Sequence, residues 1–351
     1  MRGADTNSSG VQERAVIPSI DINGLVQSTA TQEELETMAN SFDEAMRAIG
    51  MVYLINHNIS PHTIDKLRTS AKLFFDQPHH TKMESCLNKG YGHGGYVPQG
   101  VEAVARSNAP ESNAPPDLVE NLVFSHAGDP KREPVMPTQP QDLQVAVESY
   151  WTCATELLHA LMRLSALAIG LPANFFEDFY AEPKCHLRLA HYPALINDVN
   201  QSPPSQTGSI TSNMSATANT GSLRYGAHTD YTGFTLLVQD PRASGLQVQT
   251  RAGQWVSAAP VMNAILVNAG DLIQVWTNDM WRSPPHRVVP PQTVGEHPAL
   301  TSLVFFTGPA DETLVEALPG TFNDVRPSRY APISAREHLQ SKLQASNTGH
   351  K

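Results

Sequence analysis

A histidine and an aspartate stand two residues apart in the stretch RYGAHTDYTGFTLLVQD, residues 224–240. The end of this stretch has the apolar pattern of a buried strand, and side chains two positions apart on a strand project to the same face. His228 and Asp230 can therefore meet on one side of the chain, where an imidazole nitrogen and a carboxylate oxygen bind one metal ion. A hydrogen bond between the two side chains that only holds a turn is the alternative interpretation.

A second histidine, His286, follows much later in the sequence PPHRVVPP. The flanking prolines restrict this run to a short edge strand or a strand end, where side chains line the mouth of a barrel. Two histidines and one aspartate match the facial triad that holds non-haem Fe(II) and leaves other coordination positions open. Structural zinc sites usually fill four positions and use cysteine, and no cysteine lies near these residues in the sequence. The pattern therefore indicates a catalytic iron site.

The composition is typical of a globular protein that binds a small molecule. The chain has 351 residues, of which 40% are hydrophobic and 17% are charged, and its formal net charge is −10. Nucleic acids and anionic membranes require a basic surface, and because no block of Lys or Arg occurs we expect neither as a partner. We find no apolar signal segment, no membrane-spanning run and no disulfide framework among the three cysteines. We expect a cytoplasmic protein, and the sequence leaves its oligomeric state open.

Strands and helices alternate in the first part of the chain. The pattern predicts a strand over residues 16–25 that stops at the turn dipeptide Asn23-Gly24, and then a helix from the capping box of Thr31 and Glu34 to Gly50. A strand over 51–59 and a helix over 62–76 follow. Residues 88–141 are expected to form irregular connections with short strands, and residues 148–170 a long buried helix. These elements form an α/β portion that precedes the residues of interest.

From His186 onward the chain consists of short β-rich runs separated by turn signals. Such runs favour a sandwich or barrel over a parallel sheet with crossover helices. The predicted fold class is therefore α+β, with a jelly-roll-like β core that is flanked by helices. We predict a flexible tail at 1–15, an N-terminal region at 16–140, scaffold helices at 141–185, a β core at 186–310 with a mobile insertion at 199–222, and a C-terminal region with a helix at 311–351.

The segments HTDYTGFTLL, GLQV, QWV, VNAGDLIQVWTND and HRVV occur in an order that resembles the iron-dependent oxygenases related to isopenicillin N synthase. The resemblance extends to IPSIDI and GMVYLINHNI near the N-terminus and to RYAPISAREHLQSKL near the C-terminus, so it covers most of the chain. It implies a distorted double-stranded β-helix in which His228, Asp230 and His286 bind Fe(II). It also implies that 2-oxoglutarate and O2 are consumed while a small organic molecule is hydroxylated, desaturated or cyclised, with secondary metabolism as a context.

The co-substrate pocket implied by this resemblance departs from the family pattern. Members carry an Arg-x-Ser on a late strand that grips the distal carboxylate of 2-oxoglutarate, but here Leu300 stands where the arginine is expected, two residues before Ser302. A carboxylate without a cation or several donors is strongly disfavoured in a pocket of low dielectric constant. Tyr192 matches the tyrosine of the family that contacts the co-substrate, and Arg188 shares its face of the strand. We therefore predict that Tyr192, Ser302 and Arg188 bind the co-substrate.

Several alternatives stay open at this point. Arg188 can instead form an ion pair with a buried acid, while Arg224 and His297 are weaker candidates for the missing cation. Leu300 also supports an oxidase that uses no 2-oxoglutarate because its substrate chelates the iron, and a small-molecule-binding barrel without turnover is a further possibility. Residues 268–271, which include Asn268, Gly270 and Asp271, are expected to form a tight structural turn.

Overall fold

The structure is a computed structural model that describes residues 17–86, 94–107, 115–125, 136–197, 216–217, 223–291, 293 and 295–347. The predicted flexible tail at 1–15 lies outside the described residues. The same is true of the predicted insertion at 199–222, apart from residues 216–217.

The predicted alternation of strands and helices near the N-terminus is confirmed. The elements are β1 (Ser19–Asp21), α1 (Asn23–Val26), α2 (Gln32–Ala48), β2 (Met51–Ile55), α3 (Pro61–Phe75) and α4 (His79–Met83). Thr31 and Glu34 form the predicted capping box at the start of α2. The turn predicted at Asn23-Gly24 is wrong, because these residues begin α1. The Asp21 carboxylate accepts a hydrogen bond from the amide of Asn23 (2.9 Å) and so satisfies a donor of the first helical turn.

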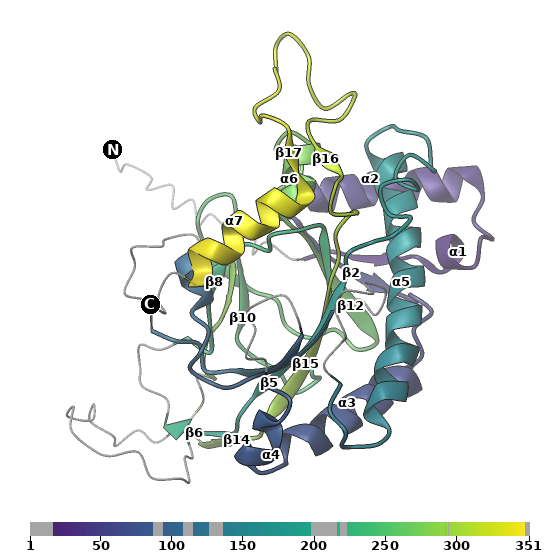
Figure 1. Cartoon of the computed structure of the whole chain (residues 1–351). Coiled ribbons are helices and arrows are strands. Elements are labelled where there is room, and N and C mark those ends of the chain that lie inside the picture. Colours follow the sequence, from purple (N-terminus) through teal and green to yellow (C-terminus); the bar gives the residue numbers. More distant parts are fainter. Residues whose placement is uncertain are drawn as a thin grey trace, which may run out of the picture.

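Two β-sheets enclose the centre of the molecule (Figure 1). The large sheet has the order β1-β2-β12-β9-β15-β5-β4-β3, and its later strands are β3 (Gly95–Val97), β4 (Glu120–Ser125), β5 (His186–Tyr192), β9 (Phe234–Val238), β12 (Ala264–Ala269) and β15 (Leu300–Phe306). The small sheet has the order β11-β10-β13-β8, with β11 (Trp255–Ser257), β10 (Leu246–Gln249), β13 (His286–Val288) and β8 (Tyr225–His228). The described residues also form strands outside these two sheets, namely β6 (Leu195–Asn197), β7 (Ala216–Thr217), β14 (Gly295–His297), β16 (Leu314–Val315) and β17 (Ile333–Ser334). This arrangement is the predicted α+β jelly roll.

The large sheet contains strands from both parts of the chain. β2 pairs antiparallel with β12, and β4 pairs antiparallel with β5, so the N-terminal strands extend the sheet of the β core on both sides. Because the two parts share one sheet, the sheet does not mark a boundary between them, and the region boundaries given in the sequence analysis stay a prediction.

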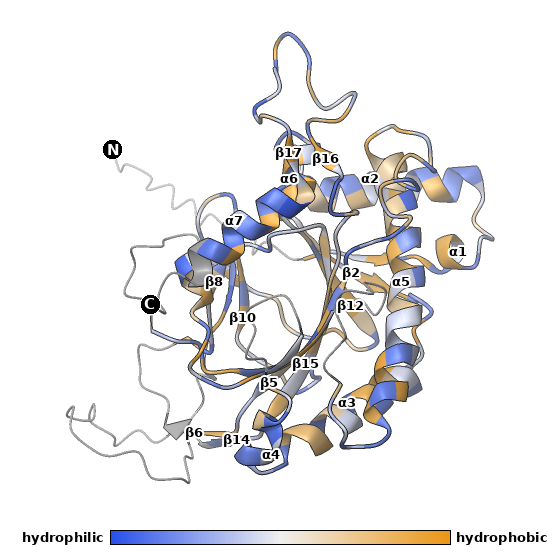
Figure 2. Cartoon of the chain, in the orientation of Figure 1, coloured by the Kyte–Doolittle hydropathy of each residue, from blue (hydrophilic) through white to orange (hydrophobic). Residues whose placement is uncertain are grey.

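Helices cover the outer face of the large sheet. The long helix α5 (Leu143–Ala168) packs against α2 and α3, and it begins five residues before the predicted start at Glu148. Figure 2 shows hydrophobic and hydrophilic residues alternating around α2, α3 and α5, as expected for helices with one buried face. Phe42 of α2 makes edge-on contacts with Trp281 (ring centroids 5.4 Å apart) and Phe234 (6.0 Å), which join the helix layer to β9.

A separate apolar cluster fills part of the space between the two sheets. Met51 and Leu266 contribute to it from the large sheet, while Val248 contributes from the small sheet. All three side chains are at most 1% exposed. This cluster packs the two sheets together. It therefore fixes the distance between the small sheet, which carries His228 and His286, and the large sheet that faces it.

Residues 264–277 (AILVNAGDLIQVWT) belong to the region predicted to consist of short β-rich runs and turns, and for the second half of this segment the prediction is wrong. β12 ends at Ala269, and residues Asp271–Trp276 form the helix α6. A short apolar run does not distinguish a buried strand from a buried helix. Gly270 marks the change: a Cβ atom here would lie 2.4 Å from the carbonyl oxygen of Gly233 and 2.5 Å from that of Thr232. Only glycine at position 270 allows the main chain of the turn after β8 to approach the start of α6 so closely.

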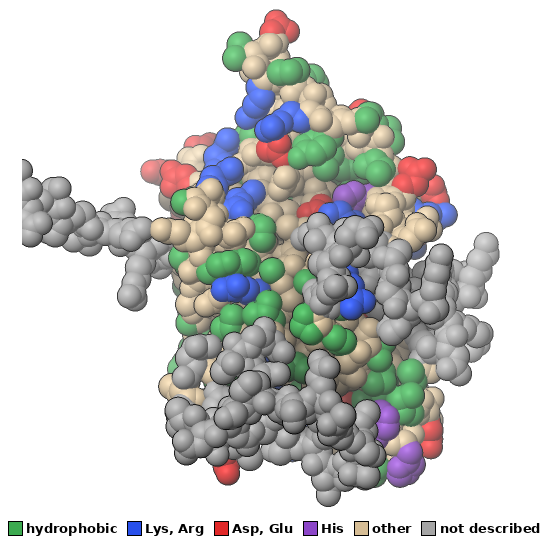
Figure 3. All heavy atoms as spheres, turned by 90° about the vertical axis from the view of Figure 1, so that its left-hand side faces the viewer, with side chains coloured by type: hydrophobic (Ala, Val, Ile, Leu, Met, Phe, Trp, Pro, Cys, Tyr) green, Lys and Arg blue, Asp and Glu red, His purple; other side chains and the backbone are tan. Residues whose placement is uncertain are grey.

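The surface next to α7 (Ala335–Asn347) carries charges of both signs. Figure 3 shows Lys, Arg, Asp and Glu side chains interspersed with apolar and neutral ones on the described part of this face. Among the described residues, no helix is both long and apolar enough to cross a membrane.

Helix α7 runs across the molecule from α6 toward β8 (Figure 1) and packs against the short helix η1 (Val104–Ser107). Asp271, the first residue of α6, contacts two side chains of α7. The Asp271 carboxylate lies 2.8 Å from Lys342 Nζ and 3.7 Å from His338 Nε2. Burial acts to raise the pKa of Asp271, but His338 and Lys342 outweigh it and lower this pKa from 3.8 to about 2.

We predict that Asp271→Asn lowers the free energy of unfolding by about 2 kcal/mol at pH 7. Because the carboxylate has a lower pKa in the folded state than in the unfolded state, its stabilisation is complete well above pH 3.8 and is lost as the pH falls toward 2. Urea denaturation between pH 7 and pH 2.5 checks this: the difference between the wild-type protein and the variant should narrow below pH 4. A difference that stays constant over this range contradicts the assignment.

Candidate metal centre

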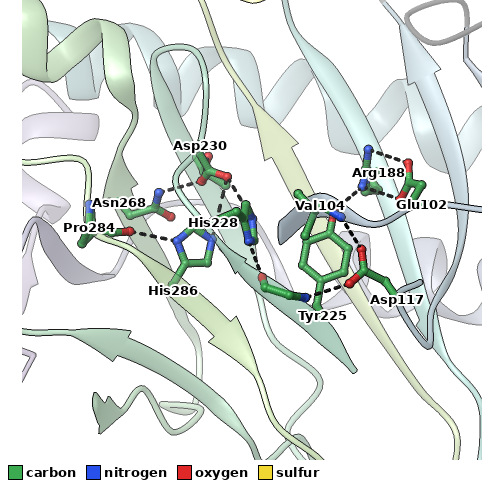
Figure 4. A network of polar contacts seen from close by, with 12 residues as sticks. Glu102, Val104, Asp117, Arg188, Tyr225, His228, Asp230, Asn268, Pro284 and His286 are labelled. Atoms are coloured by element: carbon green, nitrogen blue, oxygen red, sulfur yellow. Dashed lines mark hydrogen bonds and ion pairs between the residues drawn. The ribbon is translucent and has the colours of Figure 1, made fainter. Parts of the chain in front are cut away.

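The three predicted ligands converge although they lie far apart in the sequence. His228 ends β8 and pairs directly with His286, the first residue of β13, while Asp230 lies in the turn after β8. The Asp230 Oδ1 atom lies 3.6 Å from His228 Nε2 and 3.8 Å from His286 Nε2. Ligand atoms of all three side chains lie within 4.8 Å of one another (Figure 4).

The carboxylate of Asp230 has two different surroundings. Its Oδ2 atom accepts hydrogen bonds from Thr235 Oγ1 (2.6 Å) and Asn268 Nδ2 (2.7 Å), whereas its Oδ1 atom faces the two imidazoles. Thr235 lies on β9 and Asn268 lies opposite it on β12, so the large sheet holds the side chain in place. One oxygen is thus fixed by the protein and the other is free to bind a metal.

Both imidazoles are oriented by main-chain carbonyl groups. The Nδ1 atom of His228 lies 2.8 Å from the Gly226 oxygen, and the Nδ1 atom of His286 lies 3.1 Å from the Pro284 oxygen. A carbonyl oxygen only accepts hydrogen bonds, so each Nδ1 carries a proton and each Nε2 is the nitrogen that can bind a metal. Both Nε2 atoms point to the side on which Asp230 Oδ1 lies.

The electrostatics of the centre favour the protonation states that bind a metal. Burial and the nearby His286 lower the pKa of His228 to about 3, so its imidazole is neutral at pH 7. Burial acts to raise the pKa of Asp230, but the two histidines and the hydrogen bonds from Asn268 and Thr235 outweigh it, and the pKa lies below 3.8. A neutral imidazole and an anionic carboxylate are the forms that bind a metal ion.

The observed distances are compatible with three ligands on one face of a metal ion. Metal–nitrogen distances of about 2.1 Å put neighbouring ligands about 3 Å apart, so the separations of 3.6 and 3.8 Å from Asp230 Oδ1 need only a small contraction. Among the described residues, these three form the one group of at least three His, Cys, Asp or Glu side chains that lie close enough together to hold a metal ion. Two nitrogens and one oxygen, with no fourth donor of these types among the described residues, suit Fe(II) and leave positions for reagents.

The predicted co-substrate residues lie on neighbouring strands of the large sheet. β15 pairs with β5 so that Leu300 faces Tyr192 and Ser302 faces Ala190. Arg188 lies on the same face of β5 as Tyr192, nearer the start of the strand, and faces Val304. His297, a weaker candidate, belongs to β14, and its Nε2 atom lies 2.9 Å from the Thr293 oxygen.

Arg188 is already paired with an acid, which is the alternative that the sequence left open. Its Nη1 atom lies 3.2 Å from Glu102 Oε2 and donates a hydrogen bond to the Tyr225 hydroxyl at 2.7 Å (Figure 4). The Tyr225 ring in turn lies against the His228 ring, with centroids 4.9 Å apart. Arg188 is thus connected to the metal centre, but its charge is matched by Glu102. Its contact with the co-substrate stays a prediction.

Comparisons with known proteins agree with this centre. Residues 184–309 match the family model described as the 2OG-Fe(II) oxygenase superfamily, and residues 17–143 match the model described as non-haem dioxygenase in morphine synthesis N-terminal. The structure is similar to the crystal structure of a full-length Neurospora crassa protein in complex with thymine and alpha-KG, which is 2-oxoglutarate. The TM-score is 0.81 at 30% identity, covering 95% of this chain and 98% of that one.

The chain belongs to the 2-oxoglutarate and iron(II)-dependent oxygenase superfamily. This oxygenase is 29% identical to homoarginine-6-hydroxylase 2-ODD-233 of Oryza sativa subsp. japonica over 283 residues, which are 78% of this chain and 80% of the relative. It is 28% identical to the 2-oxoglutarate-dependent dioxygenase caaD of Aspergillus niger over 276 residues, 78% of this chain and 79% of the relative. It is therefore an enzyme that uses Fe(II), 2-oxoglutarate and O2 to oxidise a small organic molecule, as predicted.

Two residues that support the metal centre of the oxygenase were missed. Asn268 was assigned to a structural turn, but it lies on β12 and donates to Asp230. Thr235 was not singled out at all. Both contacts depend on the register of β9 and β12, and no local pattern in the sequence reports that register. The one available signal was the position of Asn268 within VNAGD, a segment that carries the family resemblance.

We predict that Thr235→Val weakens the binding of Fe(II), or of Mn(II) as a probe, by about 10- to 100-fold. The substitution keeps the shape of the side chain but removes one of the two hydrogen bonds that orient the Asp230 carboxylate. Anaerobic calorimetric titration with the metal measures the change. Thr301→Val is the matched control, because the Thr301 hydroxyl is also buried but contacts His191 Nδ1 (2.9 Å) instead of the metal centre. Equal metal affinity in all three proteins contradicts the role of Thr235.

Proposed function

We propose that His228, Asp230 and His286 are the ligands of the catalytic Fe(II) in this oxygenase. The observation that carries the proposal is the asymmetric Asp230 carboxylate, with Oδ2 fixed by Thr235 and Asn268 and Oδ1 facing two imidazole nitrogens. A carboxylate that only held a turn would have no reason to leave one buried oxygen directed at two imidazole nitrogens. We also propose that Tyr192 and Ser302 contact the 2-oxoglutarate, as the family resemblance implies.

Hydroxylation of a C–H bond is the reaction that we propose. The iron and 2-oxoglutarate together activate O2, so that one oxygen atom enters the succinate formed with loss of CO2 and the other enters the substrate as a hydroxyl group. The protein holds three coordination positions with side chains on β8, β13 and the turn between β8 and β9. Because the two sheets surround these side chains, the reacting groups are oriented and partly protected from water.

A polar small molecule is the proposed class of substrate. Arg188 and Asn121 lie on neighbouring strands, and each has a buried polar atom without a hydrogen-bond partner among the described residues, namely Arg188 Nε and Asn121 Oδ1. These atoms offer one donor and one acceptor, and Arg188 also donates to Tyr225, whose ring contacts His228. Relatives named for homoarginine and a neighbour in complex with thymine fit a polar substrate. A cytoplasmic location and independence of nucleic acid and membrane also stay predictions.

We predict that Asp230→Ala abolishes iron loading and lowers the rate of succinate formation by at least about 1,000-fold, since it leaves the ion with two neutral ligands. Iron content after anaerobic reconstitution and 2-oxoglutarate-dependent O2 uptake are the two measurements. Asp240→Ala is the matched control, because Asp240 is also a buried aspartate but pairs with Arg242 (2.9 Å) away from the metal centre. If Asp230→Ala retains iron and turnover at the level of the control, the ligand assignment is wrong.

A further inference from the structure

The large sheet lacks a cation where the co-substrate needs one. Leu300 is 7% exposed and faces Tyr192 across the β5–β15 pair, so an apolar side chain occupies the position at which the family resemblance implies an arginine. A dicarboxylate such as 2-oxoglutarate needs a cation or several donors for its distal carboxylate, because an unpaired charge is costly to bury. The cation must therefore come from another strand.

Arg188 is poorly suited to this task. Glu102, whose side chain is 5% exposed, approaches both terminal nitrogens of Arg188, at 3.2 and 3.4 Å. Asn121 Nδ2 donates to the same carboxylate at 2.9 Å and fixes it in place. A second anion next to Arg188 would be repelled by Glu102, so this guanidinium is the weaker candidate for the distal carboxylate.

Arg224 lies next to the same tyrosine and has no acidic partner among the described residues. Its guanidinium carbon lies 5.1 Å from the centre of the Tyr192 ring, and the residue is 2% exposed. Nη2 donates to the Pro193 oxygen, while the buried Nε has no hydrogen-bond partner in the described part of the chain. Burial lowers the pKa of Arg224 to about 10, only partly opposed by Tyr192. At pH 7 the side chain is therefore a buried cation to which the described residues supply no counter-ion.

The position of Arg224 relative to the metal centre suits a bridging ligand. Arg224 directly precedes β8, and its amide donates to the Val288 oxygen on β13, so it is held by the two strands that carry His228 and His286. Arg224 lies four residues before His228, so their Cα atoms are at most about 14 Å apart. A five-carbon dicarboxylate bound at the metal and an extended arginine side chain together cover a distance of this size.

We propose that Arg224 binds the distal carboxylate of 2-oxoglutarate and takes over from the arginine that Leu300 replaces. Tyr192 lies between the two positions: it faces Leu300 on β15 and carries the Arg224 guanidinium over its ring. The cation has thus moved to the opposite sheet but meets the same tyrosine. This inference rests on the proposed function, because it requires 2-oxoglutarate to bind at the His228, Asp230 and His286 centre.

The test compares 2-oxoglutarate with 2-oxopentanoate, which lacks the distal carboxylate but keeps the 2-oxo acid group. Each acid is titrated anaerobically into the Fe(II)-loaded protein, and binding is followed by the visible charge-transfer absorption of the iron complex. We expect the wild-type protein to prefer 2-oxoglutarate by at least about 30-fold, since hydrogen bonds to a charged group contribute strongly. Arg224→Leu should weaken 2-oxoglutarate binding by this factor and leave 2-oxopentanoate unchanged, so that the preference disappears.

The double variant Arg224→Leu with Leu300→Arg distinguishes carboxylate recognition from a structural role. If Arg224 only stabilises the fold, a cation introduced on β15 does not restore the preference. If Arg224 recognises the carboxylate, the arginine introduced on β15 faces Tyr192 and should restore the preference for 2-oxoglutarate. Arg242→Gln, at a residue that pairs with Asp240 away from the centre, is the control for loss of a positive charge. Arg224→Lys keeps the charge and should keep part of the preference, which covers the case in which Arg224→Leu does not fold.

A second pair of substitutions separates this inference from the prediction for Arg188. Arg188→Gln with Glu102→Gln removes both partners of the buried ion pair together, which avoids leaving one charge unpaired. We expect this variant to keep its preference for 2-oxoglutarate. Loss of the preference here, together with its retention in Arg224→Leu, overturns the assignment to Arg224. Failure of the metal centre itself is distinct, because the wild-type protein would then give no charge-transfer absorption with either acid.

Discussion

The site depends on how the carboxylate of Asp230 is divided between two tasks. Two donors from the large sheet, Thr235 and Asn268, hold one oxygen and help to offset the cost of burying the charge. The second oxygen is then aimed at the imidazoles of His228 and His286. Because Asp230 follows a strand of the small sheet and its donors lie in the large sheet, this one side chain ties the two sheets together at the metal centre.

The small sheet needs further support, because β8 is its edge strand. Asp117 supplies it from the segment before β4: Oδ1 accepts from the amide of Gly226 and Oδ2 accepts from the amide of Val104, both at 2.8 Å. A Cβ atom on Gly226 would lie 2.8 Å from the Cβ atom of Ala105, so glycine is required for η1 to pack this closely. The Gly226 carbonyl also orients His228. The N-terminal region thus contributes to the position of a ligand that it does not carry.

The sequence was sufficient for the features that depend on short-range patterns. The capping box of α2 and the short strand at His286 follow from spacing within a few residues. His228 and Asp230 do lie close together as predicted, but β8 ends at His228 and Asp230 lies in the turn that follows, so strand alternation is not the reason. The supporting contacts were not predictable because they depend on which strands become neighbours. Glu102 pairs with Arg188 across 86 residues, and the register shift between β8 and β13 sets Tyr225 opposite Val288, where strict alternation cannot place it. Buried acids and strand registers of this kind are decided by the packed structure.

The two buried arginines near the metal centre differ in whether an acidic side chain balances their charge, and this difference indicates which of them can bind a carboxylate. Arg188 and Arg224 are both largely removed from water, but within the described residues only Arg188 has a carboxylate partner, Glu102. Asn121 donates a hydrogen bond to the same carboxylate. An isolated buried cation is unfavourable for the folded protein unless a ligand compensates it. Retaining such a cation beside Tyr192 is therefore understandable if an anion regularly occupies the space between them. An oxygenase whose co-substrate is a dicarboxylate binds that anion at every turnover. The cation that binds it then lies next to β8 instead of at position 300 on β15, and the co-substrate is the same.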